Sequence, residues 1–259
     1  MRTHLKRLGT GALFLCQRPT LSSAFCVARA EMGHSFRQQE RSFACKSVNE
    51  DSSYDSKTIR VLALHGSEGN AEEFPIRLQS LKTALADAEM KLEITSVQAP
   101  FPKGNGFAWW KMPRGVRSYT ASEYEGFEDS ANKVLAAMNA QTFDLVLGHS
   151  QGAILTSALL TLERIPYHPR RGYVLNGVAF PNPFKSQLES LEIEDAPRVL
   201  FIMGLKDRIN PNSTGEKLCV GLRTSGFRTS TIKHPGGHGF PGNFEKTIND
   251  IVGWILHHD

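Results

Sequence analysis

Residues 145–153 read LVLGHSQGA, and the rest of the chain can be arranged around them. An aliphatic run ends at Gly148, and an apolar helix-forming segment begins directly after GHSQG, so this pentapeptide stands where a strand turns sharply into a helix. Gly148 and Gly152 flank Ser150 at the positions where a Cβ would crowd that crossing. The pattern predicts a nucleophile elbow, with Ser150 in a strained backbone conformation just before the helix.

Apolar runs alternate with helix-forming segments on both sides of the elbow. We expect strands at residues 59–64, 92–98, 143–148, 173–180, 198–204 and 229–234. We expect helices at residues 75–88, 123–140, 151–164, 213–223 and 243–257. Strands that alternate regularly with helices indicate the α/β class, with a mostly parallel central sheet and helices on both faces.

The length of the chain fits one α/β domain, which we expect at residues 57–259. No apolar run approaches the length of a membrane-spanning helix, so we expect no membrane span. The net charge is +4, but residues 1–50 carry eight Lys and Arg against three Glu, and the remainder is nearly neutral. The net positive charge therefore does not indicate nucleic acid as a partner of the expected domain.

Residues 1–50 have the composition of an organelle-targeting presequence. They contain several Arg, Lys, Ser and Thr and no acidic residue before Glu31. The apolar patch at residues 11–16 is too short for a secretory signal. We expect import into a mitochondrion, with a plastid as the alternative. A disordered tail or a misplaced start codon, on a cytoplasmic protein, is the other interpretation of this segment.

The cysteines are concentrated in the same segment, and the expected domain holds only Cys219. A lone cysteine excludes an internal disulfide framework and a Cys-rich metal site in that domain. A reducing compartment agrees with this usage. We expect Cys219 to be a small buried apolar group inside a helix rather than a nucleophile.

Three polar side chains follow the ends of three different expected strands. Ser150 follows the strand at 143–148, Asp207 the strand at 198–204, and His238 the last strand. Because ligands bind at the carboxyl ends of parallel strands, we expect these side chains to meet at one edge of the sheet. Their order along the chain, nucleophile, acid and base, is the order of an α/β-hydrolase triad.

These residue types suit nucleophilic catalysis on a serine. A serine hydroxyl is a weak nucleophile, so an imidazole, here His238, must take its proton during attack and return it to the leaving group. Asp207 would hold the correct imidazole tautomer and stabilise the imidazolium. The backbone N–H groups of Gln151 and Ser67 are the candidates for an oxyanion hole.

Other residues compete for these roles. His234 is a rival base, but it closes a strand, whereas two glycines ahead of His238 let that loop reach inward. Asp195 is a rival acid, but it precedes its strand and belongs to the opposite edge of the sheet. We expect His65 and His149 to shape turns or to form local hydrogen bonds. No cluster of His and carboxylates indicates a metal, and we expect no cofactor.

A long irregular segment, residues 99–122, follows the second expected strand. It contains three prolines, three glycines and the aromatic residues Phe107, Trp109 and Trp110. A loop of this length inside a compact domain usually lies over a site. The aromatic residues either line an apolar substrate pocket or anchor the loop to the domain. Our prediction is the pocket.

Five segments carry a resemblance to a known family: LALHGSEGNAEEF (62–74), FAWW (107–110), DLVLGHSQGA (144–153), GLKDRINP (204–211) and HPGGHGFP (234–241). In this order they resemble the FSH family of small serine hydrolases, which includes OVCA-type esterases and fungal thioesterases of polyketide pathways. The resemblance covers residues 57–256. It implies an α/β-hydrolase fold without a large separate cap domain, and Ser150, Asp207 and His238 as the triad. The N-terminal extension departs from the family pattern.

The sequence therefore predicts a serine hydrolase that cleaves a carboxylic ester or thioester through an acyl-serine intermediate. Its partner would be a small-molecule substrate, and whether it acts as a monomer or a homodimer stays open. An acyltransferase or lyase on the same triad is one alternative. A module with a hydrolase fold that binds a ligand without turnover is another.

Overall fold

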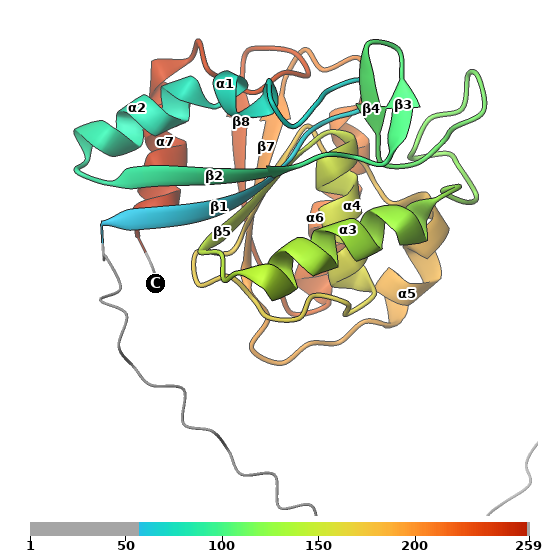
Figure 1. Ribbon diagram of the computed structural model, residues 1–259. Helices are drawn as coiled ribbons and strands as arrows, with labels where there is room; N and C mark the ends of the chain where they lie inside the picture. Colours follow the sequence, from blue (N-terminus) through green and yellow to red (C-terminus); the bar gives the residue numbers. More distant parts are fainter. Residues whose placement is uncertain (1–56, 258–259) are drawn as a thin grey trace, which may run out of the picture. The chain divides into compact units, whose positions relative to one another are not determined.

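Six parallel strands form the central sheet of the computed structural model, which describes residues 57–257 (Figure 1). The strands are β1 (Thr58–Leu64), β2 (Lys91–Val97), β5 (Leu145–His149), β6 (Tyr173–Asn176), β7 (Arg198–Gly204) and β8 (Arg228–His234). Their spatial order is β2-β1-β5-β6-β7-β8, and every neighbouring pair is parallel. The expected presequence, residues 1–50, lies outside the described residues.

Helices cover both faces of this sheet, as predicted (Figure 1). One face carries α1 (Phe74–Arg77), α2 (Gln79–Asp87) and α7 (Glu245–Leu256). The other carries α3 (Phe127–Ala140), α4 (Gln151–Thr161), α5 (Lys185–Ser190) and α6 (Asn212–Thr224), with a short 3-10 turn at Asn182–Phe184. Within residues 57–257, no helix combines the length and apolar character that crossing a membrane requires.

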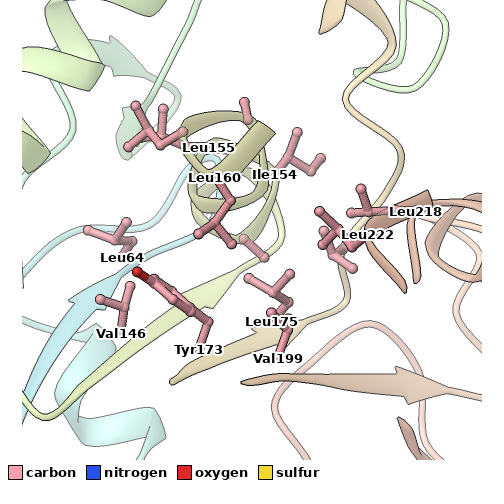
Figure 2. Packing of buried hydrophobic residues seen from close by; sticks show 14 of the residues in the cluster. Leu64, Val146, Ile154, Leu155, Leu160, Tyr173, Leu175, Val199, Leu218 and Leu222 are labelled. Atoms are coloured by element: carbon pink, nitrogen blue, oxygen red, sulfur yellow. The ribbon is translucent and has the colours of Figure 1, made fainter. Parts of the chain in front are cut away.

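Successive residues of the strands contribute side chains to two hydrophobic cores, one on each face of the sheet. In β1, Val61 and Ala63 pack with α2 and α7, whereas Leu62 and Leu64 pack with the helices of the opposite face. Figure 2 shows this second core, where Tyr173 and Leu175 of the strands lie against the apolar side chains of α4. Every residue of α4 is buried, so the helix that follows Ser150 is held rigidly in the domain.

The structure differs from the expected elements in several places, and α5 and the 3-10 turn before it were not expected. The helix expected at 75–88 is divided at Leu78, where the N–H closes a tight turn onto Pro75 O at 3.1 Å before α2 begins. The strand expected at 173–180 ends at Asn176, because Gly177 turns the chain with a φ of 58°. The segment expected to be irregular contains an antiparallel hairpin, β3 (Phe101–Lys103) with β4 (Gly106–Ala108).

Candidate active site

Ser150 occupies the strained turn between β5 and α4 that the sequence pattern predicts. Its backbone has φ 51° and ψ −116°, a combination that residues other than glycine rarely adopt. A Cβ on Gly148 would lie 2.6 Å from the Cα of Ala153, and one on Gly152 would lie 2.7 Å from the carbonyl oxygen of His65. Both positions therefore require glycine, because the strand, the helix and the loop after β1 approach each other too closely for a side chain.

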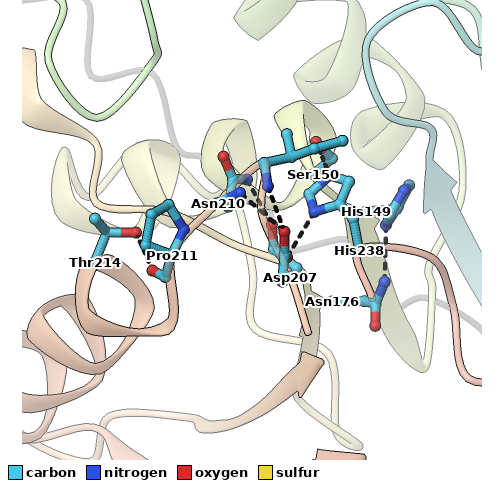
Figure 3. Close-up of polar contacts among 10 residues, drawn as sticks. His149, Ser150, Asn176, Asp207, Asn210, Pro211, Thr214 and His238 are labelled. Atoms are coloured by element: carbon cyan, nitrogen blue, oxygen red, sulfur yellow. Dashed lines mark hydrogen bonds and ion pairs between the residues drawn. The ribbon is translucent and has the colours of Figure 1, made fainter. Parts of the chain in front are cut away.

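A chain of hydrogen bonds joins Ser150, His238 and Asp207 (Figure 3). The Ser150 hydroxyl lies 2.7 Å from His238 Nε2, and His238 Nδ1 lies 2.7 Å from Asp207 Oδ2. With the proton of the neutral imidazole on Nδ1, the ring donates to Asp207 and its Nε2 accepts from the serine. The structure thus brings together the three residues that the sequence analysis placed at strand ends.

Asp207 is more enclosed than His238, with 2% of its side chain exposed against 15% for His238. Burial by itself would raise the pKa of the carboxyl group, but hydrogen bonds from His238, Asn210 and Ile209 outweigh it and hold that pKa below its ordinary value. The two backbone N–H groups of Ile209 and Asn210 reach Oδ1 at 2.8 and 3.0 Å. Asp207 is therefore an anion with one oxygen reserved for His238.

Two asparagines that the sequence analysis did not single out support these groups. Asn176 accepts the N–H of Ser150 on its backbone oxygen at 2.9 Å, and its side chain contacts His149. The side-chain amide of Asn210 donates to Gly177 O at 2.7 Å, which ties the Asp207 loop to the end of β6. The sequence could have pointed to Asn176, because it is a polar residue at the end of the apolar run YVLN, and in the structure it is buried.

His149 and His65 form local hydrogen bonds, as expected. His149 Nδ1 accepts from the Asn176 amide at 2.7 Å, and its ring centre lies 5.1 Å from that of His238. Burial first, and then the charges of His238 and Arg77, lower the pKa of His149 to about 3, so the ring is neutral. His65 Nδ1 donates to Gly66 O at 2.7 Å while its Nε2 accepts from Ala99 N at 3.2 Å.

The two expected oxyanion donors lie on the elbow and on the loop after β1. Gly66, next to Ser67, runs so close to the elbow that a Cβ there would stand 3.1 Å from Ser150 Cβ. Within residues 57–257, the backbone N–H groups of Ser67 and Gln151 donate to no protein acceptor, whereas Glu68 N and Gly69 N are both bonded. Their position and free hydrogen-bonding capacity suit the binding of a negatively charged oxygen beside Ser150.

The β3–β4 hairpin holds the loop that carries Ser67. Glu68 N donates to Phe107 O and Phe107 N donates to Gly69 O, both at 2.8 Å. On the other side, Trp109 N donates to the side-chain oxygen of Gln151 at 2.8 Å. The hairpin segment therefore bridges the loop after β1 and the first residue of α4, the two elements that carry the candidate oxyanion donors.

This arrangement corrects the expected substrate pocket. Trp109 and Trp110 are fully buried, and neither they nor Phe107 line the cavity beside Ser150. Trp109 Nε1 donates to His65 O at 2.7 Å, and Trp110 stacks on Tyr124 with ring centres 4.2 Å apart. The aromatic residues anchor the segment to the core, because burying an indole stabilises the domain more than leaving it exposed. The sequence alone was compatible with both roles, lining a pocket and anchoring the loop.

The cavity beside Ser150 has a volume of about 390 Å³ and is lined mostly by polar side chains. Phe74 and Ile209 are its large apolar members, while Lys103 and Arg117 come from the segment that was expected to supply apolar contacts. The cavity therefore borders the segment at residues 99–122, but charged side chains of that segment line it in place of the expected aromatic ones. The cavity suits a substrate with polar or charged groups near the reacting bond.

The rival residues lie away from this chemistry. His234 is buried, and its Nδ1 accepts from Gly236 N at 3.2 Å rather than contacting Ser150. Asp195 stands ahead of β7, at the opposite edge of the sheet from Ser150. Cys219 is buried in α6, as predicted. Among residues 57–257, no group of three or more His, Cys, Asp or Glu could hold a metal ion.

Comparison with known proteins gives a family match over most of the chain. A family model described as serine hydrolase (FSH1) matches residues 54–249. A protein of Anopheles gambiae named an esterase is 27% identical over 201 residues, which cover 71% of this chain and 72% of that protein. A Drosophila melanogaster protein, also named an esterase, is 24% identical over 208 residues, covering 74% and 71% of the two chains.

A solved structure supports the fold. The crystal structure of Arabidopsis thaliana SOBER1 superimposes with a TM-score of 0.61 at 20% sequence identity. The match covers 76% of this chain and 97% of that one. With the parallel sheet and the helices on both faces, this similarity confirms the predicted α/β-hydrolase fold.

Proposed function

This chain belongs to the serine hydrolase (FSH1) family, and on that premise we propose that it cleaves a carboxylic ester or thioester through an acyl-Ser150 intermediate. The observation that carries the proposal is the hydrogen-bonded chain from Ser150 through His238 to Asp207, with both contacts at 2.7 Å. The names of the two insect relatives support an ester as the substrate.

In the first step, the Ser150 oxygen attacks the carbonyl carbon of the substrate while His238 Nε2 takes the hydroxyl proton. The carbonyl oxygen becomes an oxyanion, which accepts hydrogen bonds from the N–H groups of Gln151 and Ser67. Asp207 stabilises the imidazolium across its 2.7 Å contact with Nδ1. The tetrahedral intermediate then collapses, and His238 gives its proton to the leaving alcohol or thiol.

In the second step, water attacks the acyl-Ser150 carbonyl and His238 takes a proton from that water. The same N–H groups bind the second oxyanion, and the carboxylic acid leaves as His238 returns the proton to Ser150. The water step defines the protein as a hydrolase. If another nucleophile took the place of water, the same residues would perform acyl transfer.

A fluorophosphonate probe tests for an activated serine. We expect stoichiometric labelling at Ser150, mapped by mass spectrometry, and no labelling in Ser150→Ala. A matched control is Ser157→Ala, which removes a buried hydroxyl of α4 that donates to Ile154 O at 2.8 Å. That variant should label as the parent does. Absence of labelling in the parent, under conditions that label a control hydrolase, would favour a module that binds ligands without turnover.

A second measurement separates hydrolysis from acyl transfer. With an acyl ester in buffer, the proposal expects release of the free acid with each alcohol released. Adding an alcohol or amine acceptor should leave that ratio near unity at low acceptor concentration. A ratio that falls steeply under these conditions would assign the triad to an acyltransferase instead.

A further inference from the structure

Some of the charged side chains that line the cavity beside Ser150 are paired with each other, and others are not. Lys103 and Glu68 are engaged with each other and with the loop after β1: Lys103 Nζ lies 3.5 Å from Glu68 Oε1 and donates to Ser67 Oγ at 2.9 Å. Arg77 and Arg117 also line the cavity. Glu73 is the remaining acid of the lining among the described residues.

Arg77 and Arg117 reach the cavity from separate elements. Arg77 is the last residue of α1, and Arg117 lies in the loop between β4 and α3. Within residues 57–257, neither guanidinium forms an ion pair or a hydrogen bond with a protein group. The charge of Arg77 nevertheless acts at the site, since it lies close enough to His149 to contribute to the lowered pKa of that ring. Two arginines with no ion-pair partner among the described residues thus line the cavity that contains the nucleophile.

We propose that Arg77 and Arg117 bind a negatively charged group of the substrate, so that the preferred ester or thioester carries an anion apart from the carbonyl that reacts with Ser150. This inference rests on the proposed function and names its substrate class. A guanidinium binds carboxylate and phosphate with paired, charge-assisted hydrogen bonds, and it is more weakly hydrated than an ammonium group. The cavity of about 390 Å³ accommodates a small acyl or leaving group beside these arginines.

The charge can reside on either half of the substrate, and two pairs of esters distinguish the halves. For the acyl half, monoethyl adipate is compared with ethyl hexanoate, which has an acyl chain of the same length without the carboxylate. For the leaving group, para-acetoxybenzoate is compared with para-acetoxybenzamide. We expect kcat/KM to be about three- to tenfold higher for the anionic member of one pair, because the arginines are exposed and partly screened.

Substitutions test whether the arginines cause the preference. In Arg77→Gln and Arg117→Gln, the preference should fall toward unity through a higher KM, while kcat/KM for the neutral esters stays within about twofold. Glu73→Gln should change the preference in the opposite direction, because it removes a negative charge from the same cavity. Arg114→Gln is the matched control, since Arg114 is an exposed arginine of the same loop that does not line the cavity.

Ionic strength adds an independent measurement, since salt screens contacts between exposed charges. The anionic preference should shrink as salt is raised, with little change for the neutral esters. Equal kcat/KM within both pairs, or a preference that survives in the Arg77→Gln/Arg117→Gln double variant, would overturn the inference. Such a result, together with normal turnover of neutral esters, leaves the proposed hydrolase standing. Loss of all ester turnover and of Ser150 labelling would instead contradict the proposed function itself.

Discussion

At the scale of single residues, the site contrasts two neighbouring histidines. His238 faces the Asp207 carboxylate, whereas His149 is buried against the neutral amide of Asn176. A carboxylate can stabilise an imidazolium that forms during a reaction, and an amide donor to Nδ1 cannot. This difference in partners assigns proton transfer to His238 and leaves His149 as a neutral ring that packs beside it.

Asp207→Asn should lower kcat by roughly 10³- to 10⁴-fold with little change in fold. The N–H groups of Ile209 and Asn210 would keep the amide oxygen in the place of Oδ1, so the NH₂ group would face His238 Nδ1. The imidazole would then carry its proton on Nε2 and could not accept one from Ser150. Steady-state kinetics on a chromogenic ester measures the loss. Asp195→Asn is the control, and retention of more than about a tenth of kcat in Asp207→Asn would contradict the assigned role.

His149→Phe should make stability less dependent on pH. Unfolded His149 binds a proton below pH 6.5, whereas the folded protein keeps the ring neutral down to about pH 3. Protons therefore bind preferentially to the unfolded chain in this window, and the free energy of unfolding decreases as the pH falls from 6.5, by up to about 1.4 kcal/mol per pH unit. Above pH 6.5 this contribution is constant.

Urea unfolding of the parent and of His149→Phe between pH 7.5 and 4.5 measures that difference. The variant also leaves the Asn176 amide without its acceptor, which lowers stability by a similar amount at every pH and does not alter the slope. The other buried histidines, His65 and His234, contribute equally to both proteins and cancel in the comparison. Parallel curves for the two proteins would show that His149 does not carry the lowered pKa.

At the scale of elements, the pattern of apolar residues was enough to predict the strands and the edge of the sheet where the site lies. The six strands are short apolar or alternating runs, and in a parallel sheet their carboxyl ends share one edge, so the meeting of Ser150, Asp207 and His238 followed from topology. The division of the helix at Leu78 was not predictable, because the apolar spacing is the same in one helix or two. The burial of Trp109 was not predictable from the sequence either, because its two N–H groups donate to His65 and Gln151, which are distant in the sequence.

Gly106→Ala should reduce both stability and activity. A Cβ at this position would lie 2.6 Å from the carbonyl oxygen of Gly69 and closer still to that of Glu68, so the hairpin would have to move away from the loop that carries Ser67. We expect a loss of about 2 kcal/mol or more in unfolding free energy and about a tenfold loss of kcat, through displacement of the Ser67 N–H.

Gly253→Ala is the matched control for this substitution. A Cβ on Gly253 would meet nothing within 4 Å, and the residue lies within α7, where alanine is the better helix former. That variant should be as active as the parent and slightly more stable. If Gly106→Ala behaved in the same way, the hairpin would not be what positions the loop after β1.

At the scale of the whole molecule, the chemistry and the basic charge lie in different parts of the chain. Every residue of the proposed site lies between His65 and His238, within the described domain. The first 50 residues hold eight Lys and Arg against three Glu, and they fall outside the described part of the chain. The catalytic proposal therefore makes no use of them.

We propose that residues 1–50 direct the protein into a mitochondrion, because a basic segment without acidic residues before Glu31 is typical of such presequences. A fusion of residues 1–50 to a fluorescent reporter should co-localise with a mitochondrial dye, and Arg2, Lys6 and Arg7 changed together to Glu should abolish import. A chain that starts after residue 50 should keep the kcat and KM of the full-length protein while remaining in the cytosol. A diffuse signal from the unmodified fusion would contradict targeting, and plastid fluorescence in a plant cell would redirect the proposal to that organelle.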